Sequence, residues 1–309
     1  EARRQVFDAM DWVFVNNFKF KMELAELIEK WEEKKCGVGY ADMLCLTFTN
    51  RAARAMRERI RSNVDDRGVE QVYVGNVHRY CSRFLFENAL IPAETSVIDD
   101  DDSISLVARF FDDDEMLAVA DGRRRRRYTA IVQLAAYMHQ IDHRHSRDIR
   151  LHPDCLTSDE VRVISGVCAN AGKEFTREAM LDIYRNADMY RAMLLSTDTD
   201  ITLQREAMPV LKRLEAAAYY TAYKRQHHLI DFEDILLLVY DALADDTERR
   251  FRRYPWVQVD EVQDLNPLQM RIIDLLSIEG CPDGCYMYLG DEQQAIFSFI
   301  VAKMSTLQM

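Results

Sequence analysis

The alternation of short apolar runs with amphipathic stretches constrains the fold of this sequence more than any other feature. Apolar runs typical of strands occur at Trp12–Val15, Met43–Phe48 and Val72–Gly75. Stretches with helical periodicity and charged outer faces separate them, at Met22–Lys35 and Arg51–Arg61. A further helical pattern follows at 78–90. Such alternation is typical of a parallel sheet wrapped by helices.

The alternating pattern stops in the middle of the chain and then returns. From about Pro92 to His228 strand signals are lacking, and long amphipathic stretches such as 128–145 and 176–195 take their place. Strand patterns return at Trp256–Val259 and Tyr286–Leu289, with helical patterns at 234–243 and 267–277. We therefore predict an α/β domain built from residues 1–92 and 229–309, interrupted by an all-helical insertion domain at 93–228.

Composition narrows the class of protein. Charged residues make up 30% of the 309 residues and no apolar run is long enough for a membrane span, so a cytoplasmic protein with no membrane partner is expected. The seven scattered cysteines fit reduced core thiols better than a disulfide framework. A net charge of -12 would argue against nucleic acid, but Arg123–Arg127 form a basic run. That run is either a solvated loop or a phosphate contact.

Polar clusters follow two of the predicted strands. Asp260-Glu261-Val262-Gln263-Asp264 comes directly after Trp256–Val259, and Gly290-Asp291-Glu292-Gln293-Gln294 follows Tyr286–Leu289. Ligands of open parallel sheets bind at the carboxyl ends of the strands, and a carboxylate pair there can hold Mg²⁺ and orient a water molecule. The clusters together indicate hydrolysis of a nucleoside triphosphate. Taken alone, Asp264 or Asn266 could instead cap the helix that begins at Pro267.

Several ordered segments resemble the motifs of the UvrD/Rep/PcrA family of superfamily 1 DNA helicases. They are 47–53 with Met56, Arg59 and Ile60; 75–78 with Cys81; 230–236; 259–264 with Asn266, Pro267 and Gln269; and Gly290-Asp291 with Gln294, Ile296, Phe297 and Phe299. The resemblance implies a RecA-like, P-loop-type motor domain carrying a helical insertion. It also implies an ATP-dependent 3′ to 5′ helicase that uses ATP and Mg²⁺ in DNA repair, with single-stranded DNA or DNA junctions as partner.

The resemblance assigns roles to individual residues. Three residues would be catalytic. Asp260 would hold the metal ion, Glu261 would be the base that accepts a proton from water, and Gln294 would sense the γ-phosphate. ATP would be bound by Gln5, Lys21, Asp260 and Gln263. DNA would be bound by Thr47, Phe48, Thr49, Asn50, Arg51, His78, Phe297 and Phe299, with the aromatic side chains as stacking platforms for bases.

The sequence departs from the family at the phosphate loop. Family members have Gly-x-x-x-x-Gly-Lys-Ser/Thr after the first strand, whereas this chain reads Asn16-Asn17-Phe18-Lys19-Phe20-Lys21-Met22. Phe20 and Met22 then stand where the family has a glycine and a hydroxyl, and phenylalanine cannot supply the loop's unrestricted φ values. Other departures are Asn76-Val77 for Thr-Phe and Ile300-Val301 for Arg-Gly.

These departures leave two functions open. The chain is either the N-terminal ATPase and DNA-binding half of a helicase, whose second motor domain would have to come from a partner or from elsewhere, or a hydrolysis-deficient pseudo-helicase. The latter would act as a module that binds single-stranded DNA or another protein. The degenerate loop predicts weak binding of ATP and Mg²⁺ in either case.

Overall fold

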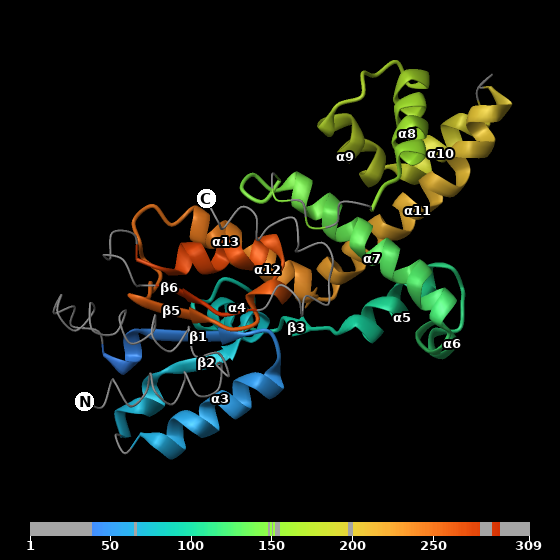
Figure 1. Cartoon of the computed structure of the whole chain (residues 1–309). Coiled ribbons are helices and arrows are strands. Elements are labelled where there is room, and N and C mark those ends of the chain that lie inside the picture. Colours follow the sequence, from blue (N-terminus) through green and yellow to red (C-terminus); the bar gives the residue numbers. More distant parts are fainter. Residues whose placement is uncertain are drawn as a thin grey trace. The chain divides into compact units, whose positions relative to one another are not determined.

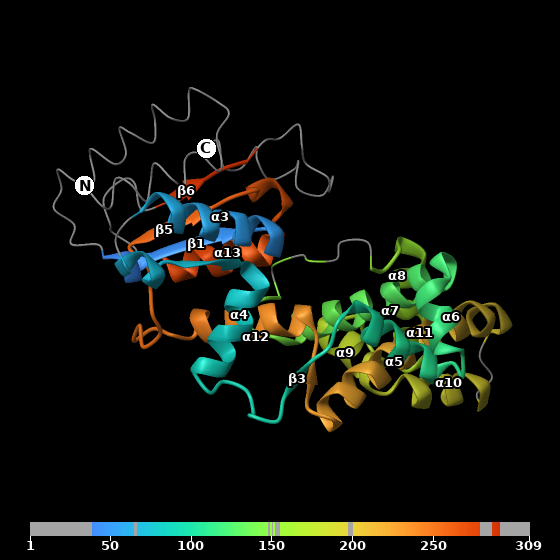
Figure 2. The ribbon, with the colours of Figure 1, turned by 90° about the horizontal axis from the view of Figure 1, so that it is seen from below.

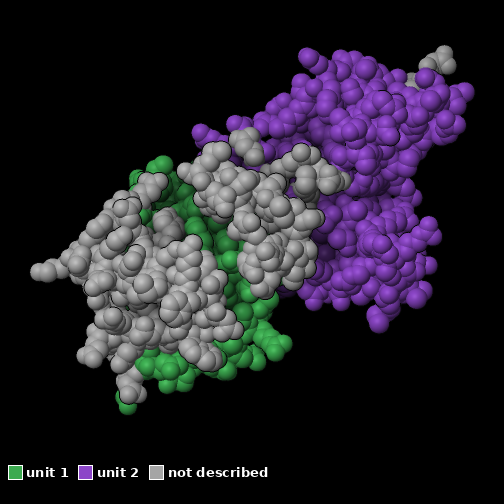
Figure 3. Space-filling view, in the orientation of Figure 1, with its two compact units in different colours: residues 1–84, 242–309 green, residues 85–241 purple. Residues whose placement is uncertain are grey.

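The computed structural model describes residues 39–64, 67–147, 149, 151, 155–196, 200–278 and 286–290. The chain divides into two compact units, coloured separately in Figure 3. The first, called the sheet unit, comprises residues 1–84 and 242–309. The second, called the helical unit, comprises residues 85–241.

The sheet unit contains a four-stranded parallel sheet in the order β2-β1-β5-β6 (Figure 1). Its strands are β1 (Met43–Thr47), β2 (Tyr73–Asn76), β5 (Trp256–Val259) and β6 (Tyr286–Tyr288). All three strand pairs are parallel, with Leu46 beside Val259 and Thr47 beside Asn76. The sheet confirms the predicted α/β class, and each predicted strand within the described residues is present with at most one residue of difference at an end.

Helices cover both faces of this sheet, which explains why its strands are mostly apolar. Every residue of β1 and β5 is buried. Helix α3 (Asn50–Asn63) buries Ala53, Met56 and Ile60 in one core cluster with strand residues of one face, while α13 (Pro267–Leu276) lies on the opposite side (Figures 1 and 2). The short helices η1 (Tyr40–Asp42), η2 (Arg67–Gln71) and η3 (Val262–Asp264) and helix α4 (Val77–Glu87) connect these elements.

The helical unit is built around one long helix, α11 (Ile201–Gln226). Packed against it are α5 (Asp100–Phe110), α7 (Gly122–Asp142), α8 (Ser158–Asn170), α9 (Arg177–Arg185) and α10 (Ala187–Ser196). Helix α6 (Glu115–Ala120) packs on α5 and α7. Tyr128, Leu134 and Tyr220 are among the fully buried side chains of the core. Aromatic rings fill much of this core and bury large apolar areas.

The expectation that 92–228 holds no strand is wrong at one point. β3 (Ser96–Val97) pairs in parallel with β4 (Leu229–Ile230), forming a second sheet of two strands. Both β3 residues are exposed, so no apolar pattern marked them. The boundaries between the sheet unit and the helical unit lie at 84/85 and 241/242. β4 and most of α12 (Phe232–Ala244) therefore belong to the helical unit. The sequence-based boundaries at 92/93 and 228/229 stay predictions.

Two other stretches differ locally from the sequence-based expectation. The helical pattern at 176–195 is split into α9 and α10, because Asn186 leaves the helical conformation and its side chain bonds back to Asp182. The arginine run forms the first turns of α7, following the cap Asp121. Arg124 and Arg125 bond at 2.6 Å to Asp113 and Asp101 of the same unit, so the loop interpretation of the run is wrong.

Within the described residues, no helix is long and apolar enough to cross a membrane. The four described cysteines, Cys45, Cys81, Cys155 and Cys168, are buried free thiols, as the sequence predicts. Burial raises the pKa of the Cys45 and Cys81 thiols, so both are held as uncharged core side chains.

Candidate functional site

The polar residues that follow β1, β2 and β5 lie at one edge of the sheet, because these strands run in the same direction. Backbone hydrogen bonds tie this edge together. Asp260 N donates to Leu46 O at 2.8 Å, Leu289 N donates to Val259 O at 2.8 Å, and Val262 N donates to Leu289 O at 3.0 Å. The carboxyl edge of β1, β5 and β6 is therefore one connected surface, the place where ligands of open α/β sheets bind.

The acidic pair lies in a tight turn after β5. Glu261 adopts the left-handed conformation, with φ 53° and ψ 44°, which is costly for a residue with a Cβ atom. The side chain of Gln263, which is 1% exposed, donates from Nε2 to Glu261 Oε2. The buried amide of Gln263 thus fixes the direction of the Glu261 carboxylate. This bond and the backbone hydrogen bonds of the turn hold Glu261 in its strained backbone conformation.

Gly290, two residues after β6, packs closely against this turn. A Cβ atom at position 290 would collide with Gln263 Oε1 and would lie 2.8 Å from Val262 Cγ1. Side-chain atoms do not approach a Cβ so closely, so any larger residue at 290 would displace the turn. Gly290 therefore keeps the amide of Gln263, and through it Glu261, in place.

Asp260 has an unusual protonation equilibrium. Burial and the neighbouring negative charge of Glu261 together raise the pKa of Asp260 from 3.8 to about 7, although the backbone N–H of Glu261 opposes the shift. Two adjacent carboxylates in a partly buried site favour a cation between or beside them. Near neutral pH Asp260 is therefore divided between its protonated and ionised forms, and a bound metal ion would favour the ionised form.

The donor set of this turn fits a hard divalent cation. Asp260 and Glu261 offer carboxylate oxygens, and Mg²⁺ is bound through one or two carboxylates together with water and substrate phosphates. No nitrogen or sulfur ligand that would favour zinc belongs to the turn. The carboxyl edge at β5 can accordingly bind Mg²⁺ and, with the held Glu261 carboxylate, accept a proton from a water molecule.

The ends of β1 and β2 present two capped helix N-termini. Thr49 caps α3, with its Oγ1 accepting from Ala52 N at 3.1 Å. Asn76 caps α4, because its Oδ1 accepts from Arg79 N at 2.7 Å, and its Nδ2 donates to Asn50 Oδ1 at 3.1 Å. One side chain therefore joins both helix starts. Helix N-termini present free N–H groups and a partial positive charge, which suits phosphate groups.

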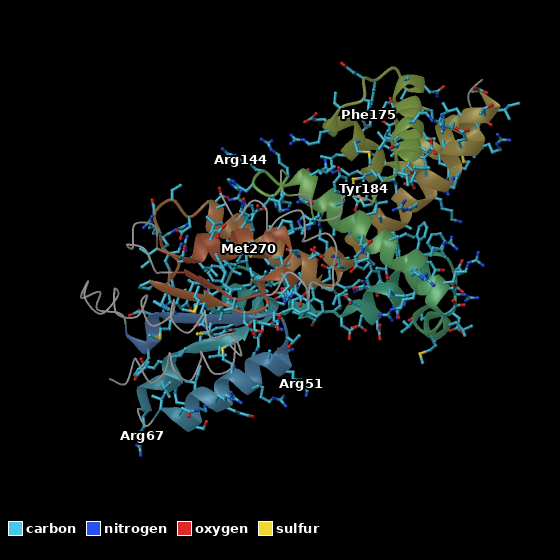
Figure 4. The ribbon with its side chains drawn as sticks, viewed as in Figure 1. Arg51, Arg67, Arg144, Phe175, Tyr184 and Met270 are labelled. Carbon is cyan, nitrogen blue, oxygen red and sulfur yellow. The ribbon has the colours of Figure 1, made fainter. Side chains whose placement is uncertain are left out.

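Arginines add positive charge beside these helix starts. Arg51 and Arg54 in the first turns of α3 and Arg79 in the first turn of α4 are exposed. Figure 4 shows Arg51 at the start of α3 with its side chain extending away from the ribbon. None of the three forms an ion pair with another residue that the structure describes. Their charge is available to an anionic ligand.

Thr47 adds a buried polar group at the same edge. It is 0% exposed, and its Oγ1 has no hydrogen-bond partner within the described part of the chain. Phe48 and His78 are half-buried, at the end of β1 and in the first turn of α4. This edge of the sheet therefore carries both a buried hydroxyl group and exposed, positively charged side chains.

The structure brings the described members of the predicted site to this one edge. They are Thr47, Phe48, Thr49, Asn50, Arg51, His78, Asp260, Glu261 and Gln263. Gln5, Lys21, Gln294, Phe297 and Phe299 lie outside the described residues, so their predicted roles stay predictions.

Sequence reasoning missed two structural roles in the site. Asn76 stood out only as a departure from a motif, although an Asn directly before the first residue of a helix is a capping signal. The role of Gly290 in accommodating Gln263 depends on a contact between two strand ends far apart in the sequence. Only the fold reveals such a contact.

The sequence is similar to known helicases over most of its length. Residues 24–309 match the family model described as UvrD/REP helicase N-terminal domain. The chain is 26% identical to the ATP-dependent DNA helicase UvrD1 of Mycobacterium leprae, with 88% of this chain and 30% of the relative aligned. It is 22% identical to the probable DNA helicase II homolog of Mycoplasma pneumoniae, over 77% of this chain and 27% of the relative.

A third relative is similar over a shorter region. The putative ATP-dependent DNA helicase YjcD of Bacillus subtilis is 28% identical over 30% of this chain and 13% of the relative. The chain therefore spans no more than 30% of the length of any of these three relatives.

Proposed function

The chain belongs to the UvrD/REP helicase N-terminal domain family, and we propose that it supplies the cation-binding carboxylates and part of the single-stranded DNA track of an ATP-dependent DNA helicase motor. The observation that carries this proposal is the meeting of the Asp260–Glu261 turn and the capped starts of α3 and α4 at one edge of a parallel sheet. One edge thus combines an acidic site for a metal ion with a basic site for phosphates.

In this proposal the acidic turn carries out the proton and metal chemistry. Bound Mg²⁺ and ATP would supply a polarised γ-phosphoryl group for attack by water. Asp260, once deprotonated, would hold the cation, and Glu261 would accept a proton from the water. Gln263 orients Glu261 through the bond from its Nε2 to Oε2. The predicted γ-phosphate sensor Gln294 and the nucleotide contacts Gln5 and Lys21 complete the proposed site.

The DNA side of the proposal rests on the opposite end of the same edge. Backbone N–H groups of α3 and α4 and the exposed Arg51 suit the phosphates of a single strand. Phe48, with Phe297 and Phe299 outside the described residues, would stack on bases. Because stacking and phosphate contacts do not read sequence, this arrangement suits a motor that moves along any strand, 3′ to 5′ as the family resemblance implies.

A second candidate function rests on the altered phosphate loop. Phe20 and Met22 occupy the places of the family's glycine and hydroxyl, and phenylalanine cannot turn bare amides toward phosphates. A chain that keeps the DNA edge but has lost this loop would be a hydrolysis-deficient module that binds single-stranded DNA. Both candidates share the DNA edge and differ only in nucleotide binding.

Titration with ATP and Mg²⁺, with and without single-stranded DNA, separates the two candidates. Micromolar ATP binding that DNA strengthens, and that Lys21→Ala abolishes while Lys19→Ala leaves it intact, supports the motor. Retained DNA affinity with no binding at millimolar ATP supports the passive module.

A parallel measurement tests the DNA edge itself. Phe48→Ala should weaken binding of single-stranded DNA by about 1–3 kcal/mol, the contribution of one stacked base. Phe86→Ala is the matched control, because Phe86 is a 42% exposed aromatic residue in the last turn of α4 and is not among the predicted DNA-binding residues. Equal affinity of both variants and the unaltered protein would remove Phe48 from the DNA track and, with it, the main aromatic support for the proposal.

A further inference from the structure

A pair of histidines in the helical unit forms a cluster unrelated to the strand edge. His139 and His143 lie four residues apart on α7, so their side chains share one face of the helix. Their Nε2 atoms are 2.6 Å apart. His139 Nδ1 lies 3.0 Å from Asp234 Oδ1, and His143 Nδ1 is bonded to Asp241 Oδ2. Both aspartates belong to α12.

The carboxylates determine which ring nitrogens carry hydrogen. An ionised carboxylate only accepts hydrogen bonds, so both Nδ1 atoms act as N–H donors. Each Nε2 of a neutral ring then presents a lone pair, and the two lone pairs face each other. Two lone pairs at this separation repel unless a cation lies between or beside them. The arrangement therefore requires either a shared proton or a metal ion.

We propose that His139 and His143 form a binding site for a borderline transition-metal ion of the Zn²⁺ class. Imidazole nitrogen is the ligand that such ions prefer among uncharged side chains. A carboxylate behind each ligand histidine, on the nitrogen away from the ion, is the arrangement that orients metal-binding imidazoles. Two histidines at i and i+4 can reach one ion from one helix face.

The surrounding charge favours a cation at this position. Asp231, Asp234 and Asp241 surround the network, whereas Lys224 is the basic residue bound among them, with its Nζ 2.5 Å from both Asp231 Oδ2 and Asp234 Oδ2. Lys224 and its two partners are nearly inaccessible to water, so their charges are poorly screened. Carboxylates thus outnumber ammonium groups, and a metal ion on the imidazoles would offset the excess negative charge.

The site is accessible and incomplete. The side chains of His139 and His143 are 23% and 31% exposed, so both rings are partly open to solvent. In the part of the chain that the structure describes, no group of three or more His, Cys, Asp or Glu side chains is arranged to hold a metal ion. Water would therefore fill the remaining coordination positions. The two Nε2 atoms would have to move apart from their present separation of 2.6 Å, because two Zn–N bonds of about 2.0–2.1 Å at a tetrahedral angle hold the nitrogens farther apart.

Zinc titration by calorimetry on the whole chain tests the proposal. We expect one Zn²⁺ per chain in the unaltered protein, and loss of that binding in His139→Gln and in His143→Gln. Asp241→Asn, which keeps both ligands, should weaken binding about 10–100-fold. His227→Gln is the control, because His227 is exposed and lies outside the cluster. Retained stoichiometric binding in the His139 and His143 variants, or equal loss in the control, would overturn the proposal.

A second measurement needs no substitution at the ligands. Imidazole ¹⁵N shifts of the unaltered chain should report Zn²⁺ on the Nε2 atoms of two histidines, with both Nδ1 atoms remaining protonated. Unchanged Nε2 shifts at millimolar Zn²⁺ would show that the pair shares only a proton, and would also overturn the proposal. Neither measurement depends on ATP or DNA, so its outcome is independent of the proposed helicase function.

Discussion

Binding of Mg²⁺ at the Asp260–Glu261 turn should depend strongly on pH. Asp260 has a pKa of about 7 without a metal ion, and its proton must leave before the carboxylate can bind a cation. The available fraction of Asp260 then falls by about tenfold between pH 8 and pH 6, which corresponds to about 1.4 kcal/mol of apparent Mg²⁺ affinity. An aspartate with an ordinary pKa would show almost no change over this range.

Calorimetric titration of Mg²⁺ at pH 6, 7 and 8 measures this effect. Glu261→Gln is the informative variant, because it removes the neighbouring charge that helps to raise the pKa of Asp260 and should move the midpoint to lower pH. Asp260→Asn should abolish the pH dependence together with most of the affinity. Equal Mg²⁺ affinity at pH 6 and pH 8 in the unaltered protein would refute the physical reasoning about the turn.

The same pKa shift has a consequence for stability without Mg²⁺. The pKa of Asp260 is raised on folding, from 3.8 to about 7, so the folded state holds this proton more tightly than the unfolded chain. The resulting stabilisation is fully present below about pH 4 and is lost as pH rises through about 7. At pH 8, saturating Mg²⁺ should raise the melting temperature of the unaltered protein but not that of Asp260→Asn.

Three further predictions concern the supporting structure. Asn76→Ala should destabilise the protein by about 1 kcal/mol in urea unfolding, because α4 loses its cap, whereas Asn63→Ala at the exposed end of α3 should cost less. Lys224→Met should destabilise it by about 3–5 kcal/mol in the same assay, since two buried carboxylates lose their counter-charge; a cost below 1 kcal/mol would contradict the buried network. Replacing Arg124 and Arg125 by Ser should leave the salt dependence of DNA binding unchanged, because both are paired with acids of their own unit; a slope lower by about one unit per arginine would show that they contact phosphate.

The described part of the sheet was predictable because its residues follow simple local rules. Strand β5 begins and ends where the apolar run Trp256–Val259 does. Helix α13 begins at Pro267 after the cap Asn266, and Gln269 completes a capping box. Alternation between such strands and helices allows few topologies, so the parallel sheet follows from it.

Other features were not predictable from local pattern. The two-residue strand β3 pairs with β4 across more than a hundred residues of chain, and its exposed Ser96 and Val97 carry no periodic signal. The arginine run at 123–127 is uniform in sequence, yet Arg124 and Arg125 pair with acids while Arg127 lies over the rings of Phe111 and Tyr128. Most of these partners come from other segments of the unit.

For the site, the sequence determined which chemical groups are present and on which strand ends they lie. It placed Asp260 and Glu261 after one apolar run and Thr47–Arg51 at the end of another, because the succession of apolar and polar residues along the chain is read directly from the sequence. The tertiary structure alone decided the raised pKa of Asp260, the hold of Gln263 on Glu261, the contact of Gly290 and the meeting of His139 with His143, Asp234 and Asp241. Burial and distance between residues remote in sequence set these properties, and neither exists until the chain has folded.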